Sequence, residues 1–200
     1  MNLVSRFGAA LVRDRDLPIA VLARKLGNNA LALASARVFL RDADRVGEHA
    51  RCFGGRPHVD NGGTLFIGDD FAANCEFGTV RLATAERGVL HVGHGVTINY
   101  GTSISARRMV SLGDRVMIGP YCVIADTELP LPLRDDEPAR PIEIRDGVWL
   151  GARVVVLPGA TIGAGAVISA GSVVSGDVPP GAVAAGNPAR VLRISDAAAA

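Results

Sequence analysis

Aliphatic side chains recur at intervals of six in the C-terminal half of the chain. The uninterrupted series is Ile144, Leu150, Val156, Ile162, Ile168 and Val174, and small or β-branched residues follow four positions after its first five members, at Val148, Val154, Ala160, Ala166 and Ser172. A period of six fits neither a helix nor a simple amphipathic strand. It predicts a chain that turns a corner every six residues, with three short strands per coil. Aliphatic columns would then fill a triangular prism whose coils are hydrogen-bonded about 4.8 Å apart.

Two earlier series extend this pattern toward the N-terminus. Val92, Ile98, Ile104 and Val110 form one, and Leu112, Ile118 and Ile124 form another that is shifted by two residues. We expect the first coils near Leu65 and Ile67, after a Gly-rich lead-in, so that the β-helix domain spans 46–193. The repeat breaks once, and the prolines and charged residues of 125–143 predict a loop inserted there that leaves the prism.

The two ends of the chain follow other patterns. Leu3, Val4, Phe7, Ala10 and Leu11 have helical spacing, and the Ala/Leu run of 30–36 suits a second helix, so 1–45 is predicted to be an N-terminal helical cap. A cap would cover the unpaired strand edges of the first coil. Because the segment carries seven basic residues, docking onto a membrane surface or a glycosyltransferase stays open as its role. Residues 194–200 are predicted to be a flexible tail.

Composition supports the prism and excludes several classes of function. Glycine contributes 24 of 200 residues and aromatic residues only 4%, as expected for a narrow core with many tight corners. A net charge of +1 argues against a nucleic-acid partner. No metal site is expected, because the three cysteines are widely spaced and His91 and His94 are too few for a three-histidine zinc site.

The same sequence features indicate a cytoplasmic protein. Free cysteines at wide spacing fit a reducing compartment, and the first twenty residues are too charged for a secretory signal. The uncharged stretch 154–176 is long enough to cross a bilayer, but Pro158 and five glycines interrupt it. We therefore interpret this stretch as part of the prism.

Two stretches of the repeat resemble a known family. The segment GVWLGARVVVLPGATIGAGAVISAGSVVSGDVPPGAVAAGNPARVL, at 147–192, closely resembles the C-terminal coils of hexapeptide-repeat acyltransferases of the serine, maltose, galactoside and polysaccharide O-acetyltransferase type. INYGTSISA (98–106) and LGDRVMIGPYCVI (112–124) resemble the central coils of the polysaccharide-biosynthesis branch. The resemblance covers about 60–193. It implies an all-β, left-handed parallel β-helix, acetyl-CoA as acyl donor, a homotrimer with sites between subunits, and O-acetylation of a sugar or glycan precursor.

The resemblance also exposes a departure at the position of the catalytic base. In the family, a histidine that acts as general base follows the segment matching VMIGPYCVIAD, and here Leu129 or Pro130 takes its place. Glu128 and Asp126 lie in the right loop and are candidate bases. His94 is another candidate, because counting in coils of eighteen residues places it two coils before Pro130 on the same face. The resulting distance of about 9.6 Å is beyond hydrogen-bond reach unless a shift in register or a neighbouring subunit closes the gap. Two alternatives stay open: a catalytically impaired protein that binds CoA or a sugar without turnover, and a trimeric scaffold.

The cofactor half of the site matches the family better. By resemblance, the backbone at Ala152 and Ala170 would receive the pantetheine arm, and Ser175 would lie near the adenine end of CoA. Arg190 and Arg193 match basic residues near the CoA phosphates, a role that suits charge-assisted contacts. A solvated C-terminal turn is the alternative for these two arginines.

One residue is a candidate for the acceptor half of the site. Asn99 aligns with an asparagine that lies near the acyl acceptor in the resembling enzymes. An asparagine that stabilises a tight corner is the equal alternative. The expected partners are therefore a sugar-type acceptor and further copies of the chain.

Overall fold

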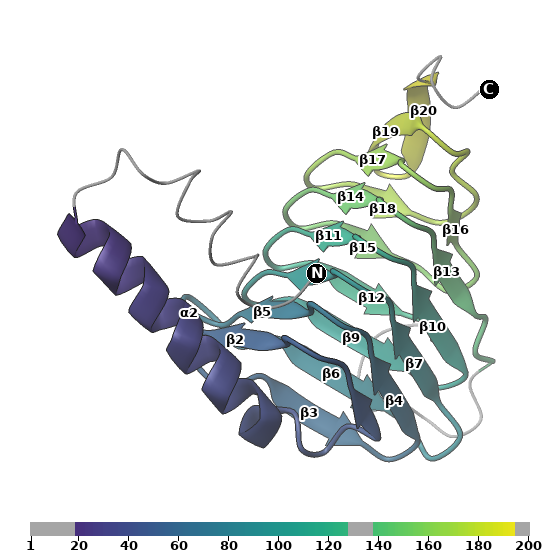
Figure 1. Cartoon of the computed structure of the whole chain (residues 1–200). Helices are drawn as coiled ribbons and strands as arrows, with labels where there is room; N and C mark the ends of the chain where they lie inside the picture. The colour runs from purple at the N-terminus through teal and green to yellow at the C-terminus, as the bar shows by residue number, and fades with distance from the viewer. Residues whose placement is uncertain (1–18, 128–137, 195–200) are drawn as a thin grey trace.

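The computed structural model describes residues 19–127 and 138–194, which form one helix and three parallel sheets (Figure 1). Sheet A contains β1 (Arg45–Val46), β4 (Thr64–Ile67), β7 (Val89–Val92), β10 (Met109–Leu112), β13 (Ile142–Ile144) and β16 (Thr161–Ile162). Sheet B contains β2 (Arg51–Phe53), β5 (Ala72–Asn74), β8 (Thr97–Ile98), β11 (Met117–Ile118), β14 (Trp149–Leu150), β17 (Val167–Ile168), β19 (Ala182–Gly186) and β20 (Ala189–Ile194). Sheet C contains β3 (His58–Asn61), β6 (Arg81–Thr84), β9 (Ser103–Ala106), β12 (Val123–Ala125), β15 (Val155–Val156) and β18 (Val173–Val174).

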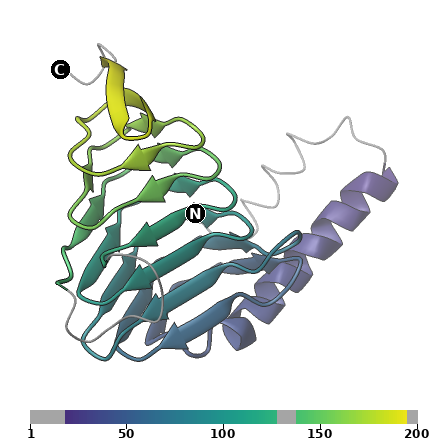
Figure 2. The same cartoon turned by 180° about the vertical axis from the view of Figure 1, so that it is seen from behind.

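The chain visits sheets A, B and C in turn, so that each coil pairs in parallel with the next. The predicted fold, a left-handed parallel β-helix with an N-terminal helix, is confirmed. The prism tapers: strands near the helix have up to four residues, whereas β14 to β18 have two each (Figures 1 and 2). At the narrow end, sheet B finishes with β19 and the antiparallel strand β20.

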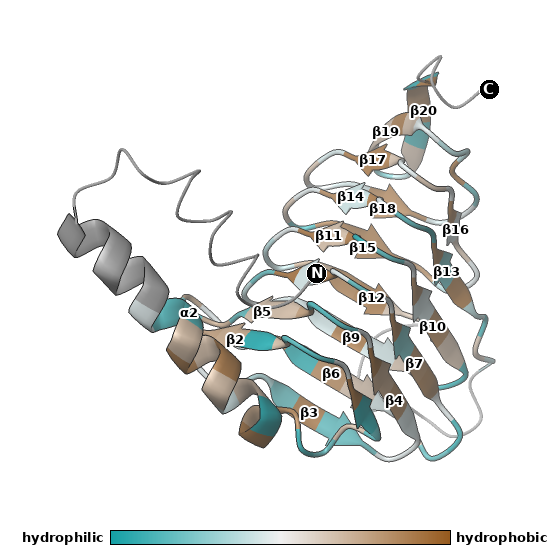
Figure 3. Cartoon of the chain, in the orientation of Figure 1, coloured by the Kyte–Doolittle hydropathy of each residue, from teal (hydrophilic) through white to brown (hydrophobic). Residues whose placement is uncertain are grey.

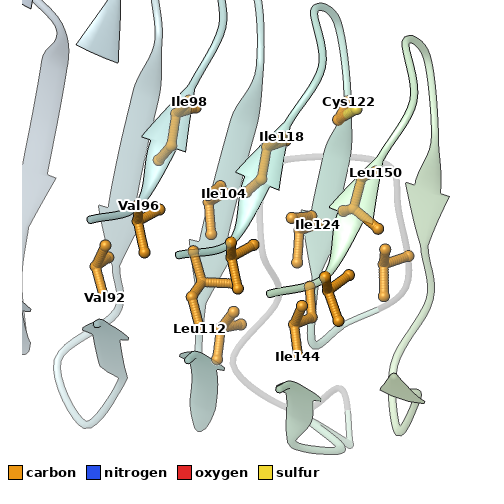
Figure 4. Packing of buried hydrophobic residues seen from close by; sticks show 14 of the residues in the cluster. Val92, Val96, Ile98, Ile104, Leu112, Ile118, Cys122, Ile124, Ile144 and Leu150 are labelled. Atoms are coloured by element: carbon orange, nitrogen blue, oxygen red, sulfur yellow. The ribbon is translucent and has the colours of Figure 1, made fainter. Parts of the chain in front are cut away.

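The six-residue series forms the core. Ile118 pairs with Ile98 on one side and Leu150 on the other, and Ile124 pairs with Ile104, which stacks these side chains in columns inside the prism (Figure 4). All five are fully buried. Burying such a side chain contributes about 1.5–3 kcal/mol, so repeating it in every coil stabilises a prism that has few aromatic residues.

The two-residue shift in the sequence pattern has a simple structural cause. Val110 and Leu112 both lie in β10 and both point inward, because four-residue strands place two side chains of alternate positions in the core. The coil that runs from β7 to β10 is correspondingly longer, and Val89 pairs with Met109, twenty residues later.

The prism begins earlier than the sequence pattern indicated. β1, β2 and β3 form a complete coil that pairs with β4, β5 and β6, so the expected start near Leu65 and Ile67 is wrong by one coil. Small inward residues hid this coil: Ala50 and Cys52 occupy core positions that aliphatic side chains fill elsewhere. β12 ends at Ala125 and β13 begins at Ile142, so the break expected at 125–143 falls between these two strands, and its residues 128–137 lie outside the described residues.

A single helix, α2 (Ile19–Phe39), lies at the wide end beside β2 (Figure 1). Ala32 and Ala36, together with Leu40 just beyond the helix, are buried, and the part of α2 that meets the prism carries hydrophobic residues (Figure 3). The opposite face exposes Leu31 and Val38, which leaves docking of the 1–45 segment a prediction. No helix among the described residues is long and apolar enough to cross a membrane. The helix expected at Leu3–Leu11 and the tail from residue 195 lie outside the described residues.

Candidate active site

Three residues singled out by sequence lie on one edge of the prism. We call the corner at which the chain passes from sheet B to sheet C the B–C edge. Asn99 follows β8 there, Ala152 follows β14, and Ala170 follows β17. Because β8, β11, β14 and β17 pair in parallel, these turns stack, and at about 4.8 Å per coil the three residues span roughly 15 Å along the axis.

The two alanines present backbone groups that a ligand can reach. Gly171 donates its N–H to the Ala152 carbonyl, at 2.8 Å, which fixes the turn between them. The N–H groups of Ala152 and Ala170 themselves donate to no acceptor within residues 19–127 and 138–194. Ala170 is exposed and Ala152 is half-buried, and neither carries more than a methyl group. The edge therefore offers two aligned donors, one coil apart, to an extended ligand that carries amide carbonyls.

Asn99 stabilises its own corner. Its side-chain amide and its backbone N–H both donate to the Ile118 carbonyl, each at 3.0 Å, which ties this turn to the next coil. The remaining side-chain oxygen accepts no hydrogen bond within the described part of the chain and lies on a half-buried residue. Corner stabilisation and a contact with an acceptor are thus compatible, because they use different atoms of the amide.

Ser175 and Arg190 meet at the narrow end of the prism. Both line a cavity of about 200 Å³ formed by the end of β18 and by β19 and β20. Arg190 is exposed and donates to the Ala189 carbonyl, at 3.0 Å, through one guanidinium nitrogen. Arg193 lies further along β20, opposite Val183, and does not line this cavity. The structure therefore groups Ser175 with one of the two predicted phosphate-binding arginines.

His94 belongs to a ladder of hydrogen bonds on another edge. At the corner between sheets A and B, His94 Nδ1 accepts the Asp69 N–H at 3.0 Å. Asp69 accepts the Glu48 N–H, Asp114 accepts the His94 N–H, and Asp146 accepts the Asp114 N–H, at 2.7–2.9 Å. His94 thus occupies a position that aspartate fills in three other coils, where a side-chain acceptor satisfies a backbone donor of the preceding coil.

The expected location of His94 is consequently wrong. It follows β7 at the A–B corner, whereas the break in the repeat falls between β12 in sheet C and β13 in sheet A. The count assumed coils of eighteen residues, but β7 and β10 pair at a spacing of twenty. His94 and the insertion therefore lie on different edges of the same subunit.

Asp126 is held by the backbone of the preceding coil. Its side chain is fully buried, and its two oxygens accept the N–H groups of Arg107, Arg108 and Met109 at 2.7–2.8 Å. The adjacent Thr127 is also buried, and among the described residues its hydroxyl has no hydrogen-bond partner. Such a carboxylate stabilises the corner from which the insertion departs. Glu128, the remaining candidate base, lies outside the described residues.

Sequence reasoning missed a cluster of aromatic side chains on the B–C edge. Phe77, Tyr100 and Tyr121 come from the turns of three successive coils and contact one another. Their signal in the sequence was weak, because the intervals of 23 and 21 residues between them are not multiples of the six-residue period. Among the described residues, no three His, Cys, Asp or Glu side chains gather closely enough to hold a metal ion.

Comparisons with known proteins agree with this architecture. Residues 141–176 match the family described as bacterial transferase hexapeptide (six repeats). The chain is 40% identical to the galactoside O-acetyltransferase of Escherichia coli over 108 residues, which cover 52% of this chain and 53% of that one. The chain spans about half the length of the first curated relatives that it matches.

Solved structures match over a larger share of the chain. A hexapeptide-repeat containing acetyltransferase from Vibrio cholerae is 30% identical, with a TM-score of 0.51, and the match covers 84% of this chain and 83% of that one. A crystal of the same Vibrio protein complexed with acetyl coenzyme A matches at 24% identity and a TM-score of 0.55, over 90% and 91% of the two chains. The chain therefore belongs to the hexapeptide-repeat acetyltransferase superfamily.

Proposed function

We propose that this protein is an acetyl-CoA-dependent O-acetyltransferase that acts on a sugar or a glycan precursor. The observation that carries the proposal is the pair of N–H groups at Ala152 and Ala170, aligned one coil apart on an open edge, for which the described part of the chain supplies no acceptor. These donors fit the amide carbonyls of a pantetheine arm. The galactoside O-acetyltransferase relative and the acetyl-CoA complex of the Vibrio protein support the choice of acceptor and donor.

The cavity at the narrow end extends this arrangement. Ser175 follows β18 at the next corner of the coil that holds Ala170, and Arg190 lies on β20, beyond that coil, so a CoA molecule running toward the narrow end would bring its nucleotide toward this cavity. Arg190 and Arg193 would bind the phosphates, and Asn99, at the other end, would contact the acceptor. The residues present thus fit the cofactor from its thioester to its nucleotide.

In the reaction, an acceptor hydroxyl attacks the thioester carbonyl and loses its proton to a general base. The carbon–sulfur bond breaks, an ester forms, and CoA leaves as the thiol once it gains a proton. Glu128 is the candidate that we retain as base. The hydrogen bonds of Asp126 point its carboxylate into the backbone of the preceding coil, and His94 lies on another edge.

A second candidate function follows from the same observations. With the family histidine replaced by Leu129 or Pro130, and Asp126 and His94 engaged in structural contacts, the chain can bind CoA or a sugar without turnover, or serve as a trimeric scaffold. The binding protein differs from the enzyme in the release of CoA thiol, and the scaffold differs from both in binding no CoA.

We also propose that the chain assembles as a homotrimer. Met117 and Trp149 are about half exposed on the outer face of sheet B, where they pair with each other and with Val167. Apolar residues paired across neighbouring strands form a continuous patch that buries well against another subunit. Val155 lies in a similar column on the outer face of sheet C.

Ligand binding and turnover test the proposal separately. Acetyl-CoA at about 100 times its Kd should stabilise the protein by about 2.7 kcal/mol, which raises the Tm by roughly 5–10 °C. Ala170→Leu should abolish that shift by filling the approach to the N–H groups. Ala164→Leu, at an equally exposed corner between sheets A and B, should keep it. An unchanged Tm for wild type with acetyl-CoA would refute both the enzyme and the CoA-binding alternative.

Turnover is measured as thiol release with a panel of sugar acceptors. We predict that Glu128→Gln lowers kcat by at least about 100-fold, the usual contribution of a general base, and leaves the acetyl-CoA shift in Tm intact. Turnover that survives this substitution would show that another group is the base. A Tm shift without thiol release from any acceptor would establish the binding protein instead.

A further inference from the structure

Three aromatic side chains form a contiguous cluster on the B–C edge. Phe77 and Tyr100 have ring centroids 5.4 Å apart at an interplanar angle of 79°, and Tyr100 and Tyr121 are 5.5 Å apart at 84°. Edge-to-face pairs of this geometry are attractive beyond the area that they bury. Both tyrosines of the chain are in this cluster, although aromatic residues make up only 4% of the sequence.

The cluster is held in place by the backbone around it. Tyr121 adopts a positive φ of 57° at its corner and donates its hydroxyl to the Phe77 carbonyl, at 3.3 Å, across two coils. Its ring packs so closely on Gly101 that a Cβ there would collide with it. Tyr100 is half-buried between the other two rings. These constraints fix the orientation of Tyr121 before any ligand arrives.

The outer two rings are nevertheless open to solvent. Phe77 is 67% exposed and Tyr121 is 46% exposed. Exposed aromatic residues held rigidly on a surface indicate a contact with another molecule. Their position on the edge limits which molecule they can contact, because they lie beside residues of the proposed site. Asn99 directly precedes Tyr100, and Ala152 lies in the turn one coil beyond Tyr121.

The polar surroundings distinguish this cluster from the apolar patch on sheet B. Glu76 and Arg153 are exposed beside Phe77 and Tyr121, and Asn99 offers an amide oxygen without a partner in the described chain. Apolar ring faces bordered by hydrogen-bonding groups match a molecule with an apolar face and a hydroxylated rim. A pyranose ring has this chemistry, because its axial C–H bonds present a positive edge to the negative face of an aromatic ring.

We propose that Phe77 and Tyr121, positioned by Tyr100, are a stacking platform for the pyranose ring of the acyl acceptor. The inference rests on the proposed function and names the acceptor site within it. Tyr121 lies about one coil, or 4.8 Å, from Ala152 along the axis, and Phe77 lies about three coils, or 14 Å, from it. A sugar at the Tyr121 end of the platform therefore brings its hydroxyls toward the thioester end of the pantetheine arm.

The direct test measures binding without acetyl-CoA. Methyl glycosides of galactose, glucose and N-acetylglucosamine are titrated into the full chain, and saturation-transfer NMR detects magnetisation passing from aromatic protons to the sugar ring. At least one glycoside should show transfer to its ring C–H protons in wild type. Phe77→Ala should abolish it, Phe77→Tyr should restore it, and Phe66→Ala should leave it intact, because Phe66 is a 38% exposed aromatic on sheet A.

Turnover supplies a second readout where thiol release occurs. Phe77→Ala should raise the KM for the acceptor about tenfold, as loss of one good aromatic contact does, with the KM for acetyl-CoA unchanged. Tyr121→Phe keeps the ring but loses the bond to the Phe77 carbonyl, so it should raise the acceptor KM only about twofold to threefold.

The outcomes separate this inference from the proposed function. If saturation transfer to the sugar is seen in wild type and lost in Phe77→Ala, but no thiol is ever released, the platform is supported and the enzymatic activity is refuted. Turnover with an unchanged acceptor KM in Phe77→Ala would support the enzymatic activity and refute the platform. Failure of every glycoside to bind wild type would overturn the platform. If Phe77→Ala changes the oligomeric mass measured by light scattering but leaves saturation transfer to the sugar intact, the cluster is a contact between subunits.

Discussion

Asp126→Asn separates a structural role for this carboxylate from a catalytic one. One carboxylate oxygen accepts the Arg107 N–H and the other accepts those of Arg108 and Met109. An amide of the same size has only one acceptor. In its better orientation, the amide oxygen keeps the latter two bonds and the NH₂ group faces the Arg107 N–H.

The cost follows from these contacts. Hydrogen bonds to a charged group contribute about 1.5–3 kcal/mol, and a buried donor left without a partner costs about 1–3 kcal/mol. Losing one bond and weakening two others should therefore lower the free energy of unfolding by about 3 kcal/mol. For a chain of this length, that change corresponds to a fall in Tm of roughly 6–12 °C.

Thermal unfolding followed by circular dichroism measures the loss, with Asp60→Asn as the control. Asp60 is an exposed carboxylate on β3, and its substitution should change stability by less than about 0.5 kcal/mol. Turnover of folded Asp126→Asn, assayed well below its Tm, should stay close to that of wild type. An unchanged Tm together with a lost kcat would refute the reasoning and make Asp126 the base.

Two further predictions concern buried or engaged polar groups. Burial raises the pKa of the Cys52 thiol from its ordinary value of 9.0 to about 12. Because the folded state then holds its proton more tightly, the stability from this group is complete below pH 9 and falls as the pH rises toward 12. Urea titrations at pH 8 and pH 10.5 should show that fall in wild type and a smaller one in Cys52→Ala. His94→Ala leaves the Asp69 N–H without its acceptor and should lower the free energy of unfolding by about 1 kcal/mol. His94→Asp supplies a new acceptor and should restore that stability. Equal urea midpoints for the two variants would contradict the hydrogen-bond ladder.

The sequence predicted the core because the fold repeats one local rule. Each inward position of a three-sided coil needs an aliphatic or small side chain, so Ile118 and Ile124 could be placed in the interior without knowing their neighbours. The rule failed at Ala50 and Cys52, where small residues fill a wider coil near the helix. Asn99, Ala152 and Ala170 were identified by the family resemblance, and the repeat rule did not place them on a common edge.

Placement of polar side chains was less predictable because it depends on register between coils. Asp126 looked like a candidate base because it lies in the loop that carries the histidine in the resembling family, and His94 did because counting in coils of eighteen residues placed it on the same face. Coils of unequal length bring each of them against backbone N–H groups instead. No periodic pattern contains that information.

The sequence by itself thus determined the architecture, because a six-residue hydrophobic period is compatible with few folds other than a three-sided parallel β-helix. Only the tertiary structure decided which edges carry the candidate chemistry. It turned His94 to the A–B corner, bonded Asp126 to the preceding coil and gathered Phe77, Tyr100 and Tyr121 beside Asn99. The physical reason is that burial alone decides which residue types fit the inward positions, whereas corner residues contact residues of other coils. The lengths of the intervening coils determine which residues those are.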